Sequence, residues 1–488
     1  MEFLNLLADI PISLFGDPQN ISLNWIGKFV QIIISSGVGV GFGIILFSLI
    51  LKVVVLPFDI FQRIAMRKQN IKMRENKDKM EKLQKQYAND KQMYNQKLME
   101  MQRQSGMSLL SSCLPMILSL VIFIMAIGAF NAYAKYSTVQ NYNSLVDAYK
   151  TAVNEYVVDV DAEDTSYTLT KEGETHLIIV EEADKLIYFR APISAETAAT
   201  LATADQATLK AEAQKVSFDK RQHLINVEKA KTNTEIAATI DFESADYTDK
   251  LLDFFHTKGA TGAKETYESE VASSTKFLWI KNVWTTDASY KHPVLSHEDF
   301  LKELASSSCG SSCSSNGKFD INGEELTLNS DGALVKDNVL ITNVYEENVY
   351  NKVTAGLEKQ KDQANGYYIL IVLSIGTILL QQFITMHSQK EQQKYSSVDG
   401  QAASTQKMTM IVMTIMFGVF SFMYSSAFSI YMITSNVFSL VSTLIINKCV
   451  DVAEHKKEAK ALQEKYSRRM PRTVQNNKTG KGKNKKGK

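Results

Sequence analysis

The chain has 488 residues, enough for about three soluble domains of ordinary size. Its 54 basic and 53 acidic residues nearly cancel, so the net charge of +1 indicates no polyanionic partner for the chain as a whole. Four cysteines exclude a fold built on a disulfide framework. Seven prolines and 23 glycines exclude a fibrous or wholly disordered chain.

The first segment, Met1 to Gly16, is apolar but is interrupted by Asp9 and Pro11. It lacks the basic start and the small-residue cleavage site of a secretory signal. We expect a short amphipathic helix on the outer membrane surface, within an N-terminal outer interfacial segment 1–28. The sequence also lacks an Arg-rich transit peptide, which favours a bacterial cell (plasma) membrane.

Long stretches without charge follow. Residues 29–51 are uncharged, and about 20 apolar residues suffice to cross a bilayer as a helix. Residues 113–134 and 367–386 are similar. The 40 uncharged residues between Lys407 and Lys448 correspond to about 60 Å of helix, twice a ~30 Å hydrocarbon core, so they predict two spans. The polar run 424–426 predicts the turn between these spans.

The sequence therefore predicts an all-α polytopic membrane protein that also carries an inserted extracytoplasmic α+β domain. The five transmembrane helices are predicted at residues 29–58, 113–134, 366–386, 408–424 and 427–447. The other parts are a cytoplasmic helical hairpin 59–108, the extracytoplasmic domain 135–365, a cytoplasmic loop 387–407 and a basic cytoplasmic tail 448–488.

Charge predicts the orientation. Segments 59–112, 387–407 and 448–488 carry a combined charge of +17, whereas residues 135–365 carry −15. Lys and Arg are enriched in cytoplasmic loops, so the positive segments are predicted inside and the acidic one outside. Five spans then place the N-terminus outside and the C-terminus in the cytoplasm.

The basic segments suggest two contact surfaces. In the hairpin, turn residues 88–90 separate two helical arms, which carry methionines at positions 66, 73, 80, 93, 99 and 101. Such flexible side chains suit a surface for varied apolar partners, although an ordinary antiparallel coiled coil explains the arms equally well. The Lys-rich arm 476–488 is expected to bind a polyanion, either ribosomal RNA or anionic lipid.

Lys52 is the charged residue within the predicted spans. An ammonium group at mid-helix costs about 2.5–3.5 kcal/mol on insertion scales, which marks a functional site, although Lys52 could instead snorkel to the interface. Ser48 lies one turn away on the same helical face. Further polar residues in the spans could line a wet indentation together with these two: Ser119, Gln381, Gln382, Ser429, Tyr431, Thr434, Ser435 and Asn436. Gly37/Gly41 and Gly39/Gly43 are predicted small-residue packing pairs.

With these spans, this hairpin and these polar residues, the chain resembles the YidC and oxidase-assembly (Oxa) family of membrane protein insertases. The resemblance covers about half of the chain, in the order of the family. It rests on Gly43–Pro57, Leu83–Tyr87, Asn95–Met99, Ser112–Pro115, Phe277–Ile280 with Asp287, Tyr367–Leu370, and Ser429–Tyr431 with Ser435–Asn436.

The resemblance implies a five-helix core with a hydrophilic groove that is open to the cytoplasm and lipid and closed to the outside. Family members insert and fold nascent membrane proteins without nucleotide hydrolysis, alone or beside the Sec translocon. It implies no catalytic residue, cofactor or metal. The groove residues it implies are Lys52 at the family's arginine, Ser48, Ser119, Gln382 and Tyr431. Lysine keeps the charge but loses the planar fork of arginine.

The chain also departs from the family. Ser119 replaces a usual glutamine, and Val121, Thr414 and Ser425 replace prolines, which predicts straighter helices. Two long interruptions, 138–272 and 294–365, flank the Phe277 signature. Alternating patterns predict strands at 165–190 and 319–349, and an Ala-rich helix at 195–215.

The outer segment holds Cys309 and Cys313, for which a disulfide and two free thiols are both open. The nearest histidines, His292 and His297, lack zinc-finger spacing. An alternative reading of the whole chain is a membrane-anchored extracytoplasmic scaffold or receptor, in which the spans serve as an anchor. A small-ion channel fits less well because the spans hold too few charges for a selectivity ring, and an enzyme fits least.

Overall fold

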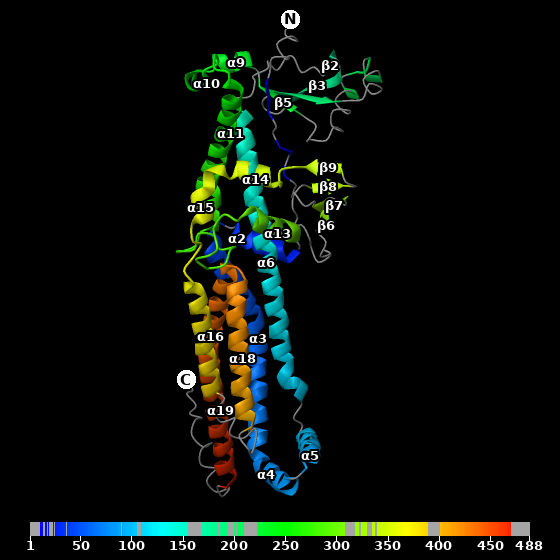
Figure 1. Cartoon of the computed structure of the whole chain (residues 1–488). Helices are drawn as coiled ribbons and strands as arrows, with labels where there is room; N and C mark the ends of the chain where they lie inside the picture. Colours follow the sequence, from blue (N-terminus) through cyan, green and yellow to red (C-terminus); the bar gives the residue numbers. More distant parts are fainter. Residues whose placement is uncertain are drawn as a thin grey trace, which may run out of the picture. The chain divides into compact units, whose positions relative to one another are not determined.

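The structure is a computed structural model of the chain, and its described part is mostly helical (Figure 1). It describes residues 10–12, 15–16, 18, 23, 25–35, 37–88, 90–104, 109–154, 168–172, 174–182, 186–192, 200–201, 203–205, 207–208, 222–225, 227–307, 318–321, 324–328, 334–336, 339–388 and 401–469. The chain divides into two compact units. The first unit contains residues 1–47, 122–374 and 416–432, and the second contains 48–121, 375–415 and 433–488.

Long helices dominate the described residues. Three of them contain segments long and apolar enough to cross a membrane: Val40–Phe61, Ile369–His387 and Ser426–Cys449. Trp25–Ile34 and Thr414–Met423 are shorter apolar segments. The long helices are α3 (Val40–Glu75), α6 (Leu109–Asn154), α16 (Ile369–Ser388), α18 (Gln401–Met423) and α19 (Ser426–Arg469).

The predicted first span differs from the structure. The uncharged stretch 29–51 is not one helix, because α2 (Trp25–Ile34) ends before α3 begins. Gly37 and Gly39 lie in the break with φ of 83° and 80°, a region that glycine adopts without steric cost. The predicted packing role is therefore wrong for these two glycines. Gly41 and Gly43 do lie in close contacts, since an added Cβ would collide with the ring of Phe277 at Gly41 and would lie 3.1 Å from Ile34 Cα at Gly43, but the predicted pairs do not form.

The amphipathic helix predicted for Met1 to Gly16 is wrong where the structure describes this segment. Ile10–Ile12 is strand β1, which pairs antiparallel with β5 (Gln222–Ile225). Phe15 is buried in the core of the first unit, and the backbone N–H of Gly16 donates to Asn343 Oδ1 at 3.1 Å. Pairing with a distant strand satisfies the backbone that an isolated short helix would leave to water.

Two antiparallel sheets belong to the first unit. The first has the order β1-β5-β4-β3-β2, with β2 (Thr168–Glu172), β3 (Glu174–Glu182) and β4 (Leu186–Pro192). The second runs β6-β7-β8-β9, with β6 (Lys318–Ile321), β7 (Glu324–Leu328), β8 (Leu334–Lys336) and β9 (Val339–Thr342). The strands predicted at 319–349 are wrong for the last three residues, 347–349, which instead begin helix α14 (Glu347–Val353). There, Val349 and Val353 bury one helical face. The helix predicted at 195–215 lies mostly outside the described residues.

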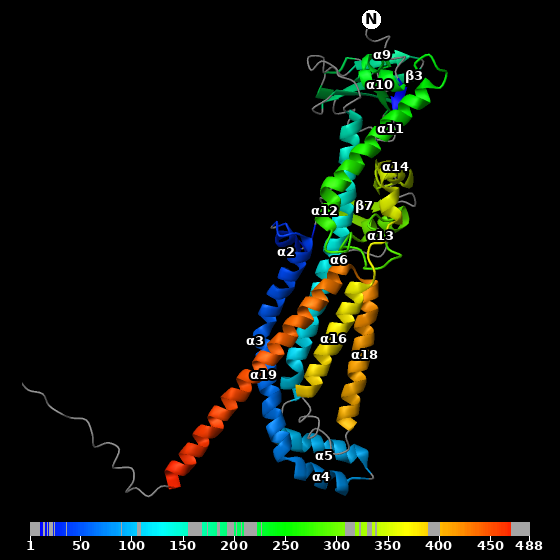
Figure 2. The ribbon, with the colours of Figure 1, turned by 90° about the vertical axis from the view of Figure 1, so that its left-hand side faces the viewer.

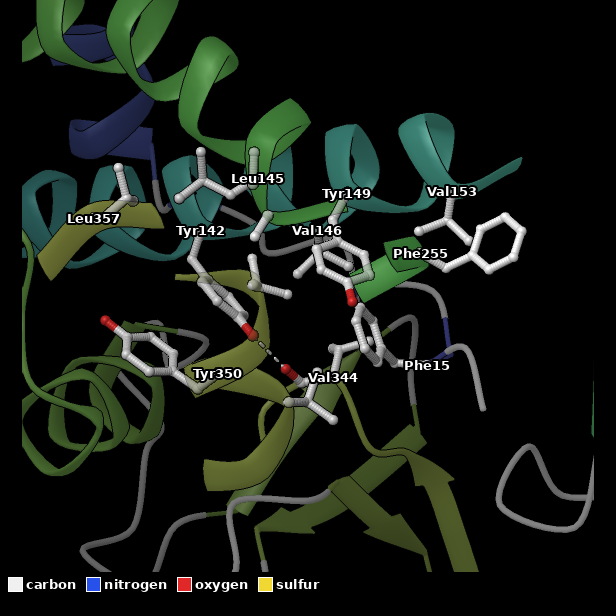
Figure 3. Close-up of a cluster of buried hydrophobic side chains, with 14 of the residues drawn as sticks. Phe15, Tyr142, Leu145, Val146, Tyr149, Val153, Phe255, Val344, Tyr350 and Leu357 are labelled. Atoms are coloured by element: carbon white, nitrogen blue, oxygen red, sulfur yellow. Dashed lines mark hydrogen bonds between the residues drawn. The ribbon is translucent and has the colours of Figure 1, made fainter. Parts of the chain in front are cut away.

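The core of the first unit forms on the C-terminal half of α6. This helix continues well past the predicted span end at residue 134, and its side chains from Val139 to Val153 pack against α11 (Tyr247–Thr266), α13 (His297–Ser307) and α14 (Figure 3). Tyr142 Oη donates to the backbone oxygen of Val344 at 2.7 Å. Tyr149 packs on Phe15, with ring centroids 5.0 Å apart. The remaining helices of this unit are α9 (Val227–Thr232), α10 (Thr234–Thr239), α12 (Ala272–Thr275) and α15 (Glu358–Asp362), with a π-helical turn at Tyr267–Val271 and a 3-10 turn at Ala355–Leu357.

The helical hairpin belongs to the second unit. Figure 2 shows α4 (Lys77–Gln86) and α5 (Lys91–Gln104) lying side by side. Asp90 Oδ1 accepts the backbone N–H groups of Gln92 and Met93 at 3.1 and 2.9 Å, so the predicted turn chemistry begins the second arm. Met80 is buried and Met93 is exposed, so the described methionines are divided between packing and surface.

Candidate functional site

Lys52 and Ser48 lie one turn apart on α3, in the second unit. Ser48 is fully buried, Lys52 is half-buried, and the neighbouring Val53 and Val54 are exposed. Apolar residues from Val40 to Leu56 keep this helix continuous, and Pro57 lies inside it. One face of the helix therefore carries a hydroxyl and an ammonium group, whereas the neighbouring exposed positions 53 and 54 carry valine side chains.

Asp59 was not among the predicted residues of the site. The candidate span Val40–Phe61 includes it, whereas the predicted span ended at residue 58. It lies seven positions after Lys52, which places both on one helical face, and its carboxylate acts electrostatically on the Lys52 ammonium. The i, i+7 spacing was the available signal. The site is therefore less positive than one isolated lysine would make it.

Interhelical hydrogen bonds hold the other polar residues of the second unit. Thr414 Oγ1 donates to Gln382 Oε1 at 2.8 Å and joins α18 to α16. Asn436 Nδ2 donates to Thr377 Oγ1 at 3.3 Å and joins α19 to α16. Such bonds are ordinary adhesion between membrane helices. The family has proline at the position of Thr414. In this chain the threonine instead supplies a hydroxyl that binds Gln382.

Three serine hydroxyls are buried without a hydrogen-bond partner among the described residues. Ser435 lies in the second unit, and Ser425 and Ser429 lie in the first. An unsatisfied buried polar group costs about 1–3 kcal/mol, and bound water is the usual remedy. The serines of this part of the chain therefore favour water within the helical bundle.

Tyr431 belongs to an aromatic cluster in the first unit. Its ring centroid lies 6.4 Å from Phe123, 5.6 Å from Phe130 and 6.4 Å from Phe428, and the side chain is buried. Its predicted contact with a client segment stays a prediction. Ser119 lies in α6, but its side chain is outside the described residues.

A buried carboxylate organises the beginning of α16 in the first unit. Asp287 Oδ1 accepts the backbone N–H groups of Tyr367 and Tyr368 at 2.7 and 3.1 Å, and its Oδ2 accepts that of Leu370 at 2.6 Å. Gly366 is required beside it, since an added Cβ would collide with Asp287 Oδ1. The sequence pointed to Asp287 through the resemblance alone.

Further bonds extend this arrangement to the turn before α19. The backbone oxygen of Thr285 accepts both the N–H and the hydroxyl of Ser426, at 2.9 and 2.7 Å. Thr286 Oγ1 donates to the oxygen of Tyr424 at 3.0 Å. Asn365 Nδ2 donates to the oxygen of Asn282 at 3.0 Å. One loop of the first unit thus fixes the ends of two candidate spans.

The described residues contain no group of three or more His, Cys, Asp and Glu side chains that could hold a metal ion. His292 Nδ1 pairs with the oxygen of Gln363 at 3.1 Å, and His297 Nε2 pairs with the oxygen of Tyr345 at 2.9 Å. Cys309 and Cys313 lie outside the described residues.

Long apolar helices, a half-buried cation within one of them and hydrogen bonds between them define a polytopic helical membrane protein. The sequence model of the 60Kd inner membrane protein family matches residues 33–206 and 339–454, more than half of the chain. The chain belongs to this family, the YidC/Oxa family. The match leaves out residues 207–338, so the resemblance at Phe277 to Ile280 stays an expectation.

Relatives named membrane protein insertase YidC match parts of the chain. The protein of Fusobacterium nucleatum is 33% identical over 92 residues, which cover 19% of this chain and 43% of the relative. That of Caldanaerobacter subterraneus is 31% identical over 114 residues, covering 23% and 53%. That of Clostridium tetani is 32% identical over 107 residues, covering 22% and 47%. The chain spans about half the length of these curated relatives, and no solved structure matches it. The relatives and the apolar helices support an integral protein of the cell membrane.

Proposed function

We propose that this protein is a membrane protein insertase and chaperone, which passes hydrophobic segments of nascent proteins from the cytoplasm into the bilayer without nucleotide hydrolysis. The observation that carries the proposal is the half-buried Lys52 inside the candidate span Val40–Phe61. A cation at such a depth is costly and marks a functional site by default. The family and the names of the relatives supply the class of function.

The groove would be a hydrated, positively charged half-channel. Lys52 and Ser48 supply a charge and a hydroxyl on α3, and Gln382 supplies a further polar group on α16. Tyr431 on α19 is assigned to the groove by the family resemblance. Ser435, buried without a partner among the described residues, supports the presence of water. Ser119 is assigned to the same groove by sequence alone.

Transfer of the client's apolar side chains into lipid drives insertion at about 0.8 kcal/mol per buried methylene. The groove lowers the barrier, because the polar flank of the client meets water and a fixed charge instead of acyl chains. The cation attracts acidic flanks most strongly. The nearby Asp59 limits this attraction, so the site does not trap an acidic client permanently.

The proposed topology has five spans, with the N-terminus outside and the C-terminus in the cytoplasm. The two spans beyond the three candidates are residues 113–134, which lie in α6, and residues 408–424, of which all but the last lie in α18. The inserted α+β domain 135–365 lies outside, and the hairpin 59–108 and the tail 448–488 lie inside, following the charge distribution. Proposed partners are nascent membrane proteins, the Sec translocon, and the ribosome or anionic lipid at the tail.

Site-specific photo-cross-linking tests this function. A photo-reactive amino acid at position 52, 382 or 431 is expected to cross-link to a stalled nascent membrane protein, because a client in the groove passes these side chains. The matched control is position 54, which lies two residues after Lys52 and carries an exposed valine on α3. It should cross-link to lipid and give little client product.

The alternative is a membrane-anchored scaffold or receptor, favoured by the large buried core of the first unit around α6 and α11. In that case the spans only anchor the chain. Client products would then be equally weak at positions 52, 382, 431 and 54, and this result would exclude the groove.

A further inference from the structure

Residues Phe277 to Ile280 form a tight turn that presents a leucine to the surroundings. Phe277 and Ile280 exchange two backbone hydrogen bonds of 3.0 and 2.9 Å. Leu278 at the tip has a φ of 54°, a left-handed conformation that is unfavourable for a residue with a Cβ, and its side chain is 61% exposed. The protein's own core gains little from this leucine.

The turn is fixed beside the beginning of a candidate span. The ring of Phe277 occupies the space next to Gly41, where a Cβ would collide with it. Phe277 also meets Phe42 edge to face, with ring centroids 5.7 Å apart. Both α3 residues belong to the first turn of the span Val40–Phe61. The turn therefore lies at the level where this helix enters the bilayer.

Two more span ends lie on the same loop. Ser426 begins the span Ser426–Cys449, and both its N–H and its hydroxyl donate to the oxygen of Thr285. Asp287 binds the N–H of Leu370, the second residue of the span Ile369–His387. Three spans thus end against residues 277–287, all within the first unit.

The loop that contains the turn, and the residues it binds before α16, also carry exposed tyrosines and lysines. Tyr290 is 58% exposed and Tyr367 is 61% exposed. Lys276 is exposed and Lys281 is partly exposed. Tyrosine is enriched where a membrane meets water, and lysine places its stem on apolar surface while its ammonium reaches phosphate groups. This composition suits phospholipid rather than a protein partner.

We propose that residues 276–291, together with Tyr367, dock on the bilayer interface beside the span ends, with Leu278 inserted among the upper acyl chains. Tyr290 and Tyr367 lie at the level of the headgroups, and Lys276 and Lys281 face lipid phosphates. The occupant of this surface is phospholipid because the three span ends fix its depth. The inference depends on the membrane-spanning helices and is independent of the groove around Lys52.

Fluorescence quenching tests this docking. The full-length chain, with its four cysteines replaced by serine, is labelled with an environment-sensitive fluorophore at Leu278→Cys or Tyr290→Cys and placed in phospholipid vesicles. Lipids that carry a spin label just below the headgroup should quench both positions severalfold more than lipids labelled deep in the acyl chain. Thr257→Cys, exposed on α11, is the matched control and should stay unquenched.

Quenching at Leu278 and Tyr290 no stronger than at Thr257 would overturn the proposal. So would labels that are shielded from both the lipid quencher and aqueous iodide, since this pattern means that a protein covers the surface. The thermal unfolding of each labelled variant is compared with that of the parent chain. If the turn does not tolerate a label at position 278, position 290 still gives a decisive result.

Discussion

Replacing Asp287 with alanine is expected to lower the free energy of unfolding by about 3–5 kcal/mol, the largest loss we expect from one substitution outside the apolar core. Its buried carboxylate accepts three backbone N–H groups, two of them before α16 and one in its first turn. Without it the N–H of the buried Leu370 loses its acceptor, and the N–H of Tyr368 keeps only its 3.2 Å bond to the backbone oxygen of residue 287. Thermal unfolding of the protein in detergent measures the effect.

Two further variants make the result specific. Asp287→Asn keeps one carbonyl oxygen, so its loss should fall between those of the parent and of Asp287→Ala. Asp299→Ala removes a partly exposed carboxylate whose contacts are ion pairs with Lys291 and Lys302. It should change stability by less than about 1 kcal/mol. Equal losses at 287 and 299 would contradict the role of the buried carboxylate.

Lys52→Ala is expected to reduce insertion of clients with acidic outer segments by about tenfold, while clients with neutral outer segments change little. A charge pair a few ångströms apart in a partly hydrated protein gives a few kcal/mol, and about 1.4 kcal/mol of it corresponds to this factor. Lys52→Arg should retain insertion because it keeps the charge. Lys52→Glu should be the most impaired. Rescue of cells depleted of the parent protein measures the order.

The neighbouring carboxylate provides a second test of the same charge. Asp59→Asn removes the negative group that acts on Lys52, so it should favour clients with acidic outer segments. If Lys52→Ala and Lys52→Glu both restore insertion fully, the charge has no role.

The sequence predicted the features that depend on local composition. The uncharged stretch around Leu370, the part of the first stretch from Val40 onward, and the turn chemistry at Asp90 agree with the structure because hydropathy and capping act over a few residues. The break at Gly37 and Gly39 was missed, since hydropathy carries no information on backbone conformation.

Long-range contacts could not be derived from the pattern. Asp287 binds the first turn of a helix about 80 residues later in the chain. Phe15, near the N-terminus, packs on Tyr149 in α6. Neither pairing leaves a periodic signal. For the candidate site, the pattern predicted that Lys52 and Ser48 share a face of α3. It did not predict Asp59, because the predicted span ended at residue 58, just before this acidic residue.

The most direct test of the hydrated cation is thiol accessibility at position 52. In a chain whose own cysteines are replaced by serine, Lys52→Cys is treated with a water-soluble maleimide in membrane vesicles, beside Val53→Cys and Val54→Cys on the exposed face of α3. We predict rapid labelling at 52 and almost none at 53 and 54, since water reaches the first position and acyl chains surround the others. Labelling at 52 as slow as at 53 and 54 would contradict the hydrated groove.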